Sequence, residues 1–571
     1  MSKFSALRPR LLWRWLGATV LVFALGAALV TYGLSHTRSA AQAQYGEPVD
    51  VPPGQVALAC PAVPQTVNPN AVDVEGKPLP TPRIAGSVTA VVMARSGKAP
   101  DQATYVPFGP DGSAVAVSSV EDPDAASSQG SASGQTQATT ENPDSAANSQ
   151  QTASTPEPNP NNATAARTST GPTSTGPTST GPTSTGPTST QNPNATSLEF
   201  TPRSAMLVAQ ADTPRPGIFT AEPWGGKAAL AAADIEQSVS SGDFRGLATA
   251  TCVPASQESW LVGGSTAPGQ STTLQVVNLS SNAVSANIDI WGDTGKLEFP
   301  RGTKLVVSPR STVSIPLESQ VQGNQRLVTR VKANGAGLAA FLQTHSLLGL
   351  TPGGVSLVHP STRAAQVQVV PGVALNADLG AVRLLNTGED VARASISVVG
   401  EGGSTAVAGA QEVELDPGAV FDFTLGGVPE GNYSVVVNSN QPVVAGAVIY
   451  RQGSESKTEK GKFSRDLAWL PALSAGGGVV IGPAAVERQL MVTNLSGQAA
   501  EFRIGGEAHS VAPNTTVVLP LTAETPLQIE APNLYVTQIL TTNLGDGLGI
   551  DSLEPTPDLD AARQVYVHLN S

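Results

Sequence analysis

Two cysteines, Cys60 and Cys252, are the residues of this 571-residue chain whose chemistry is easiest to define. A catalytic thiol needs a base and an orienting group, and neither cysteine has a local His or Asn partner pattern. Thiols in an oxidising compartment tend to pair. The first expectation is therefore a disulfide between Cys60 and Cys252 across a large loop. Two unpaired, buried thiols are the alternative.

The histidines are too scattered in sequence to build a local metal site. None stands at His-x-x-x-His spacing, and no Cys-x-x-Cys pair occurs, so the sequence predicts no metal ligands and no cofactor. The two nearest to one another are 345 and 359, each close to the end of an expected strand. The five are His36, His345, His359, His509 and His568.

Paired carboxylates are the remaining candidates for acid–base chemistry. Asp289 with Asp293, and Asp551 with Glu554, are close in sequence, but a chain with 45 acidic residues contains such pairs by chance. The chain also lacks a Gly-x-Ser-x-Gly elbow and a phosphate-binding loop. The sequence therefore predicts no catalytic residue and a protein that is not an enzyme.

Composition restricts the partners and the fold class. A formal charge of -13 argues against nucleic acid, because binding to a phosphate backbone needs clustered Lys and Arg. Only 13% of residues are charged, while Gly (57) and Pro (46) are abundant. This composition favours short strands joined by many turns.

The N-terminus has the pattern of a membrane anchor. Residues 15–34 form a run of twenty without a charge, long enough as a helix to cross the roughly 30 Å hydrocarbon core. Because basic residues precede it, residues 1–14 are expected in the cytoplasm and the rest outside, in a single-pass protein of the cell membrane. A cleaved signal peptide is the alternative, since Ala41-Gln42-Ala43 has the small-x-small form of a cleavage site. Cleavage near Ala43 would release a secreted protein.

A low-complexity segment at about 113–196 divides the N-terminal part of the chain. It is rich in Ser, Thr and Pro and ends in four tandem Gly-Pro-Thr-Ser-Thr units at 171–190. Such a composition predicts disorder, with or without O-glycosylation. Strand-like sequence and one cysteine lie on each side, so residues 45–256 are expected to be one β-rich domain with an insert. A possible short helix spans 227–235.

The remainder of the chain repeats. Three strand-like segments end in Asn278, Asn386 and Asn494, which are 386 − 278 = 108 and 494 − 386 = 108 residues apart. Each asparagine precedes a turn and a second alternating segment, which is a hairpin signature. A Pro-led turn follows in each copy, at Pro309, Pro417 and Pro513.

The repeats predict an all-β protein. Six to eight short strands per copy are typical of tandem immunoglobulin-like β-sandwich domains, here at 257–360, 366–464 and 465–571. Two copies are expected to begin with a tryptophan, Trp260 in the first and Trp469 in the third. We expect the units to lie in a row after the N-terminal transmembrane helix.

One stretch of sequence resembles a known family. The text Gly242-Asp-Phe-Arg-Gly-Leu-Ala-Thr-Ala-Thr-Cys252, then Trp260-Leu-Val-Gly-Gly264 and the strand that ends in Asn278, is similar to an uncharacterised actinobacterial family of secreted or single-pass envelope proteins. The resemblance covers about 50–112 and 198–571 and concerns a domain of unknown function. It implies an envelope location and no catalytic residues.

The function expected from these features is non-enzymatic. A membrane-anchored extracytoplasmic rod of tandem β-sandwiches would act as a scaffold or binding protein in the cell envelope, with an envelope protein or glycan as partner. A mere spacer is a simpler role. The alternative from another class is an envelope glycan-active hydrolase, with its site in the N-terminal domain around Trp224-Gly-Gly226.

Overall fold

The computed structural model describes most of the chain between residue 49 and residue 565. No helix within the described residues is long and apolar enough to cross a membrane. The predicted anchor at 15–34, the possible cleavage site near Ala43 and nearly all of the predicted insert lie outside them. The described residues are 49–50, 54–64, 82–95, 102–109, 112–114, 198–203, 206–224, 226–299, 302–376, 380–457, 459–482, 486–522, 526–559 and 564–565.

The described part of the chain is all-β, as the sequence predicts. Its regular elements are strands arranged in many sheets, together with one short 3-10 helix, η2 (Leu317–Ser319). The predicted short helix at 227–235 is wrong, because this segment enters strand β8 (Leu230–Val239). Strand β8 pairs with a neighbour on each side and is buried almost throughout, so its pairing overrides the helix propensity of its alanines.

The first repeat consists of two sheets that share one core. One sheet has the order β13-β12-β16-β10-β19, with β14 also paired to β12, and the other has the order β15-β11-β17-β18. Leu261 and Ile288 from one sheet and Leu274 and Leu342 from the other belong to the same buried cluster. The strands are β10 (Glu258–Val262), β11 (Gln270–Asn278), β12 (Val284–Gly292), β13 (Gly295–Leu297), β14 (Lys304–Val307), β15 (Ser311–Pro316), β16 (Val328–Ala333), β17 (Ala339–Leu348), β18 (Thr351–Val358) and β19 (Pro360–Ser361).

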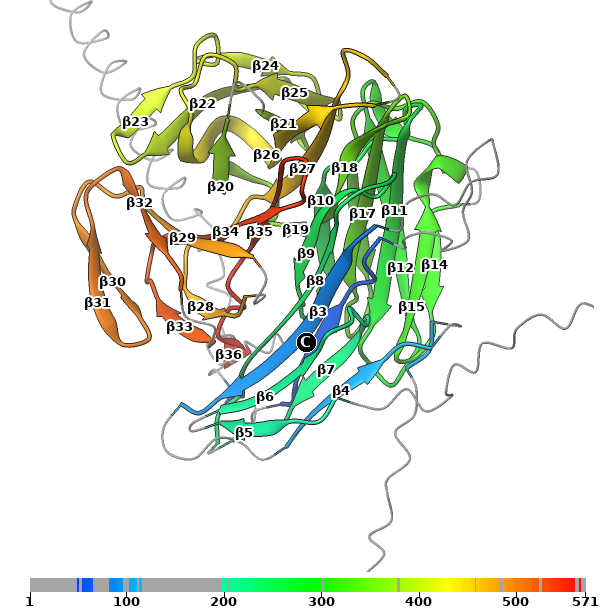
Figure 1. Cartoon of the computed structure of the whole chain (residues 1–571), viewed down its shortest axis with the longest axis vertical. Coiled ribbons are helices and arrows are strands. Elements are labelled where there is room, and N and C mark those ends of the chain that lie inside the picture. The colour runs from blue at the N-terminus through cyan, green and yellow to red at the C-terminus, as the bar shows by residue number, and fades with distance from the viewer. Residues whose placement is uncertain are drawn as a thin grey trace, which may run out of the picture. The chain divides into compact units, whose positions relative to one another are not determined.

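The second repeat has the same strand order, but one long strand joins its two sheets (Figure 1). The first half of β26 pairs with β20 and β22, and its second half pairs with β21 and β27. The predicted boundary between residues 464 and 465 falls inside β27. We call β27 the closing strand of this repeat, because it is the last strand at the edge of its sheet, as β9, β18 and β35 are in the other modules. Trp469 therefore lies at the end of the second repeat and not at the start of the third. The strands are β20 (Ala365–Leu375), β21 (Gly380–Asn386), β22 (Ala392–Gly400), β23 (Gly403–Ala406), β24 (Val413–Leu415), β25 (Val420–Thr424), β26 (Gly431–Glu455) and β27 (Phe463–Pro471).

The third repeat is the shortest of the three. Its sheets have the orders β28-β33-β30-β31 and β32-β29-β34-β35. One strand, β31, stands where the first repeat has both β13 and β14. The strands are β28 (Gly478–Val480), β29 (Glu487–Asn494), β30 (Ala500–Ile504), β31 (Glu507–Val511), β32 (Thr515–Pro520), β33 (Leu527–Glu530), β34 (Tyr535–Asn543) and β35 (Leu548–Leu553).

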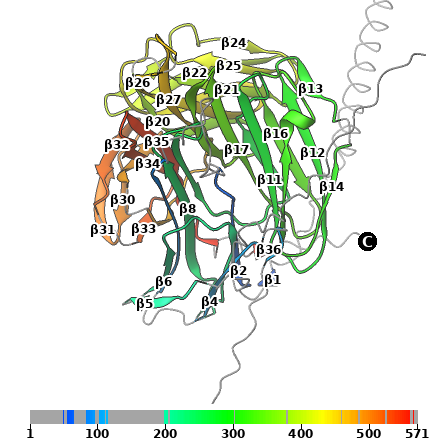
Figure 2. The same ribbon diagram turned by 45° about the vertical axis from the view of Figure 1, so that its right-hand side comes forward.

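The N-terminal module is a fourth copy of this arrangement, which the sequence did not reveal. Its sheets run β4-β7-β2 and β5-β6-β3-β8-β9. Apart from the added edge strand β5, they match β12-β16-β10 and β15-β11-β17-β18 of the first repeat in both sheet order and chain order. Figure 2 shows β2, β4, β6 and β8 of this module grouped together. The strands are β2 (Val56–Cys60), β3 (Ile84–Met93), β4 (Ala103–Pro107), β5 (Thr201–Arg203), β6 (Met206–Ala211), β7 (Gly217–Ala221), β8 as above and β9 (Gly246–Thr251); β1 (Val49–Asp50) pairs with β36 (Gln564–Val565).

The four modules do not simply follow one another in a row. The closing strand of each module contacts the next, in the sequence β9 to β18, β18 to β27 and β27 to β35, and β35 returns to contact β9. The expectation of a rod is therefore wrong. The physical reason is that these closing strands are buried on both faces, as the near-continuous burial of β9 and β18 shows, so the outer face of each needs cover from another module.

Candidate functional site

The two cysteines form the expected disulfide, inside the N-terminal module. Cys60 ends β2 and Cys252 directly follows β9, with their Cα atoms 4.4 Å apart at a sequence separation of 192. Both are fully buried. Ala59 and Val253 exchange two backbone hydrogen bonds of 2.8 and 3.0 Å beside the bridge. The disulfide therefore ties one sheet of the module to the other and has no access to solvent.

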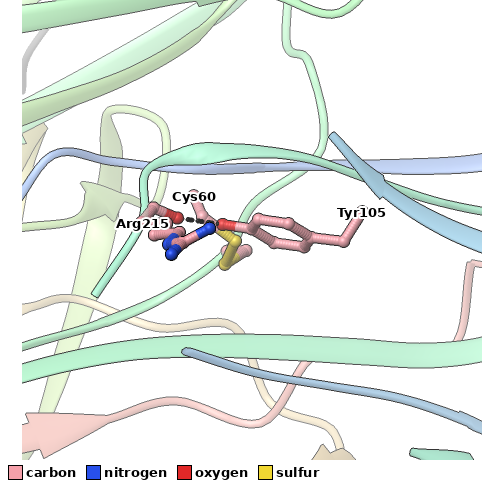
Figure 3. The surroundings of a disulfide bond; sticks show 4 residues. Cys60, Tyr105 and Arg215 are labelled. Atoms are coloured by element: carbon pink, nitrogen blue, oxygen red, sulfur yellow. Dashed lines mark hydrogen bonds between the residues drawn. A yellow bond between two sulfur atoms is a disulfide. The ribbon is translucent and has the colours of Figure 1, made fainter. Parts of the chain in front are cut away.

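Tyr105 lies beside this disulfide (Figure 3). Its side chain is fully buried, and its hydroxyl donates a hydrogen bond to the carbonyl oxygen of Arg215. Burial raises the pKa of Tyr105 well above its usual value. A buried phenol with its one donor satisfied is a packing residue rather than a reactive one.

Asp289 and Asp293, one of the carboxylate pairs noted in the sequence, are paired with different cations. Asp289 pairs with Arg330 and Lys296, whereas Asp293 pairs with Arg326. Burial would raise the pKa of Asp289, but hydrogen bonds from Lys296 and Arg330 outweigh it and lower the pKa.

The histidines likewise stay apart. His345 stacks on Phe244 and contacts the carbonyl oxygen of Asp243 at 2.9 Å, while His509 stacks on Phe502. Among the described residues, no group of three His, Cys, Asp or Glu side chains could hold a metal ion. His36 and His568 lie outside those residues.

A buried polar junction forms where the four closing strands meet. Asp466 of β27 is fully buried, and its Oδ2 accepts hydrogen bonds from the backbone N–H groups of Leu247 in β9 at 3.0 Å and Ile550 in β35 at 2.9 Å. Its Oδ1 accepts a longer bond from Val355 in β18 at 3.5 Å. One carboxylate of the second repeat thus satisfies amides of the other three modules.

The junction continues through a histidine–carboxylate contact. Nδ1 of His359 lies 2.6 Å from Oε2 of Glu554, and its Nε2 lies 3.2 Å from the carbonyl oxygen of Thr249. Burial alone would lower the pKa of His359, but the Glu554 carboxylate outweighs it and raises the pKa to about 9. Asp551 accepts the backbone N–H of Thr249 at 2.7 Å, and burial raises its pKa well above the usual value.

Two further carboxylates, Asp234 and Glu236 of β8, border the junction. Burial raises the pKa of Asp234 to about 8 and that of Glu236 to about 7. Together with Ile481 and Gly482 they line a gap that is too narrow for a water molecule. A carboxylate pair with raised pKa values is a feature of acid–base sites, but the described residues leave no room for a substrate beside this one.

A cleft of about 460 Å³ lies between the first and second repeats. Its floor includes residues of the outward face of the sheet β25-β21-β26-β27, and its rim includes the loop after β10 and the end of β17. This volume suits a small organic ligand. The residues that line it are Gly264, Ser265, Ala267, Pro268, Gln270, Ser271, Gln325, Arg326, Thr344, His345, Ser346, Leu348, Gly353, Arg383, Asp422, Tyr450, Arg465, Leu467 and Trp469.

Arg383 organises the floor of the cleft. Its guanidinium makes a bidentate pair with Asp422 at 2.8 and 2.9 Å, and donates to the carbonyl oxygen of Gly264 at 2.6 Å. It also stacks over Trp469, with its Cζ 4.5 Å from the ring centroid. These contacts hold Arg383 in one position, and the bond to Gly264 connects the second repeat to the first.

The two other arginines that line the cleft, Arg326 and Arg465, make fewer contacts than Arg383. Arg326 bonds to Asp293 at 3.0 Å and stands 3.8 Å from Asp422. Arg465 differs, because its Nε atom is buried and has no hydrogen-bond partner. The sequence did not predict this site, since its residues come from several strands and loops of two different repeats. The signal available was the polar residues at 383, 422 and 465 within strands that are otherwise apolar.

The region around Trp224, where a hydrolase site was the alternative, is a turn between β7 and β8. Trp224 is 39% exposed, and its backbone exchanges two hydrogen bonds with Lys227, of 2.9 and 3.1 Å. The cleft and the carboxylates of the junction lie elsewhere.

Comparison with known proteins places the chain in a family but adds no activity. A model of a family of unknown function (DUF5719) matches residues 207–532, from within β6 to just beyond β33. No curated protein sequence and no solved structure matches the chain. The match covers more than half of the 571 residues and confirms the resemblance to an uncharacterised family. The chain therefore belongs to the DUF5719 family of unknown function.

Proposed function

We propose that this chain is a membrane-anchored, extracytoplasmic binding protein of the cell envelope. The observation that carries the proposal is the cleft between the first and second repeats, which has the volume of a small-molecule site and polar groups in its floor. The buried Cys60–Cys252 disulfide supports an oxidising location outside the cytoplasm. The charge-free run at 15–34 supports a single-pass anchor.

The proposed role is binding or scaffolding rather than catalysis. The one carboxylate that lines the cleft, Asp422, is already paired with Arg383. Hydrolysis of a glycan needs a second carboxyl group to share the work with the first. The carboxylates with raised pKa values are sealed in the junction, where they hold strands together.

The scaffold for this cleft is proposed to be four immunoglobulin-like β-sandwiches. The support is the common strand order of the four modules and the single core that lies between the two sheets of the first repeat. The first strand of each repeat, β10, β20 or β28, also occupies the equivalent position in its sheet, which fits that architecture.

The binding role is tested with a variant that fills the cleft. Full-length protein, extracted from the membrane in detergent, is incubated with envelope extract, and the retained material is compared with that of Ala267→Trp. We expect at least one small molecule or glycan to be retained by the unsubstituted protein and lost from the variant. The matched control is Ala499→Trp, because Ala499 is exposed in a turn of the third repeat. Equal retention by all three proteins would reject the cleft as the binding site.

The topology is tested in intact cells. A membrane-impermeant amine reagent should label exposed lysines of the folded modules, such as Lys296, and membrane fractions should retain the labelled chain. Labelling only after lysis would contradict the extracytoplasmic placement. Recovery of the labelled chain from the medium, with a new N-terminus after Ala43, would replace the anchor with a cleaved signal peptide.

A further inference from the structure

The cleft is positively charged on a chain that is strongly acidic. Three arginines line it, Arg326, Arg383 and Arg465, against a single carboxylate, Asp422. The whole chain carries a formal charge of -13. A local excess of guanidinium groups in a concave, partly desolvated site attracts anions despite an opposite net charge, because nearby charges dominate at a Debye length of about 10 Å.

The structural needs of the fold account for two of these arginines. The guanidinium of Arg383 binds Asp422 and the carbonyl oxygen of Gly264 and stacks on the Trp469 ring. Arg326 is held by Asp293, with Asp422 also within 4 Å. Neither can turn toward a ligand without breaking contacts between the repeats.

Arg465 is the cation that the fold leaves uncommitted. It lies in β27 opposite Gln452, and its Nε is buried without a hydrogen-bond partner. A buried donor left without a partner is unfavourable. The same group gains a charge-assisted hydrogen bond when an anion enters. Its neighbours on the floor, Tyr450 and Leu467, lie on the same or adjoining strands.

The uncharged part of the lining suits a hydroxylated ligand. Ser271 lines the cleft with its hydroxyl group, and the side-chain amide of Gln270 donates to Ser346 at 2.9 Å on one wall. The hydroxyls of Ser265 and Thr344 already donate to the carbonyl oxygens of Asn324 and Ser356, so they could only accept from a ligand. The aromatic side chain of Trp469 is only 7% exposed and is covered by Arg383, so it offers no open stacking face for a sugar ring. Charge therefore selects the ligand more than stacking does.

We propose that the cleft binds a small hydroxylated molecule that carries a carboxylate or phosphate group, and that Arg465 is the residue that contacts this anionic group. Arg326 adds attraction, and Arg383 holds the floor in shape. This inference rests on the proposed binding function and specifies the chemical class of its ligand.

Calorimetric titration of the full-length protein in detergent tests the proposal. The probes are inorganic phosphate, D-glucuronate and, as the neutral counterpart, D-glucose. We expect saturable binding of phosphate, glucuronate or both, weaker at high ionic strength, and no binding of glucose. The relative affinity of the first two distinguishes a phosphate ligand from a carboxylate ligand.

Three variants locate the contact. Arg465→Gln should weaken binding at least tenfold, equivalent to about 1.4 kcal/mol. Arg465→Lys should recover part of the affinity, because it keeps the charge but not the forked geometry. Arg503→Gln makes the same charge change on an exposed residue of β30 and should bind like the unsubstituted protein. Circular dichroism melting checks that each variant is folded.

Two results would overturn the inference. One is the absence of saturable binding of either anion by the unsubstituted protein up to about 20 mM, where affinity is already below that of most specific sites. The other is unchanged affinity in folded Arg465→Gln. If glucose binds and Ala267→Trp abolishes that binding, the proposal of an anionic ligand is rejected, but the cleft remains a binding site. Loss of all cleft-dependent retention would instead reject the proposed function itself.

Discussion

At the scale of single residues, the buried polar side chains of the junction and the arginine at position 465 have opposite roles. Asp466, His359 and Asp551 are buried with their hydrogen-bonding partners supplied by other modules. Such groups favour one arrangement of the modules, because any other arrangement would leave a buried polar group without its hydrogen-bond partner. Arg465 differs from the other two arginines of the cleft, because its buried Nε has no hydrogen-bond partner, and a ligand contact is therefore assigned to it.

Asp234 should make stability depend on pH. Its pKa is raised by burial to about 8, so the folded protein keeps a proton that the unfolded chain has lost. The stabilisation is therefore complete below pH 3.8, the usual value, and is lost as the pH rises through about 8. His359, raised to about 9, acts in the same direction. The thermal unfolding midpoint should be lower at pH 8 than at pH 5.

The variant Asp234→Asn isolates this contribution, because it is isosteric and does not titrate. We expect it to raise the midpoint at pH 8 and to flatten the decline between pH 5 and pH 8, measured by circular dichroism. Glu554, Arg488 and Glu236 also act on Asp234 and should leave part of the decline in place. A decline as steep as that of the unsubstituted protein would show that Asp234 is already ionised in the fold.

At the scale of elements, the repeated asparagines and prolines build the same two turns in each repeat. Asn278, Asn386 and Asn494 are all fully buried, and each donates its amide to a carbonyl four residues on and to the facing strand. The sequence correctly predicted a turn after each asparagine, but the predicted hairpins are wrong. The strands on either side, such as β11 and β12, lie in different sheets and do not pair, because each turn leads the chain from one sheet to the other.

Removal of one of these amides should destabilise the repeat that contains it. In Asn494→Ala the carbonyl oxygens of Gln498 and Ala512 lose donors at 2.6 and 3.1 Å, and the N–H of Ser496 loses its acceptor at 2.9 Å. We expect a loss of about 2–3 kcal/mol in the free energy of unfolding, measured with urea. Asn438→Ala changes an exposed asparagine of β26 and should stay within about 0.5 kcal/mol. Similar losses in the two variants would refute the role of the buried amide.

The proline-led turns place the next residue in the left-handed region. Arg310, Gly418 and Asn514 follow the three prolines with φ values of 45, 73 and 50°, as position i+2 of a type II turn requires. Gly418→Ala should therefore cost about 1–2 kcal/mol through backbone strain alone, because the nearest atoms to an added Cβ, in Trp291, are 3.7 Å away.

A second glycine provides the control for this backbone effect. Gly402 also lies in a turn, with nothing within 4 Å of an added Cβ and no left-handed φ. Gly402→Ala should leave the urea midpoint unchanged or slightly higher. Equal effects of the two substitutions would attribute the loss at Gly418 to something other than φ.

The elements also show how far the sequence can predict this fold. Alternating apolar segments and a 108-residue spacing were sufficient to find the strands and three of the four copies. The fourth was hidden because its equivalent of the Asn-led turn is absent and because residues 108–205 separate β4 from β6. The alanines of β8 favour a helix locally, and only the strands on either side decide otherwise.

At the scale of the whole molecule, closure of the array is the property that sequence patterns could not reveal. Pairing of β35 with β34 is local, but contact between β35 and β9 joins modules at opposite ends of the described chain. The signal in the sequence was the run Gly246–Thr251, which has no charged residue, yet nothing in that run identifies the module that covers it. The cleft shares this difficulty, since Arg383 and Arg465 become neighbours of the loop after β10 only through packing.

Asp466 should couple the unfolding of the modules that it joins. Asp466→Ala leaves the amides of Leu247 and Ile550 buried without acceptors, which should cost about 3 kcal/mol. In differential scanning calorimetry we expect one main transition for the unsubstituted protein and a broader or divided transition, at lower temperature, for the variant. Asp212→Ala removes an exposed carboxylate from the N-terminal module and should leave the trace unchanged. A uniform shift without broadening would mean that Asp466 stabilises the modules but does not couple them.

Closure of the four closing strands also constrains how such a chain can evolve. A linear array can gain or lose a unit by duplication or deletion at either end, because each unit contacts only its neighbours. Here a fifth module would have to separate β35 from β9, so the number of modules is fixed by the closed contact. Growth is then confined to loops within a module, and the connection between β4 and β6 carries far more residues than its counterpart between β30 and β32. New sequence, natural or engineered, is most readily accommodated at this connection.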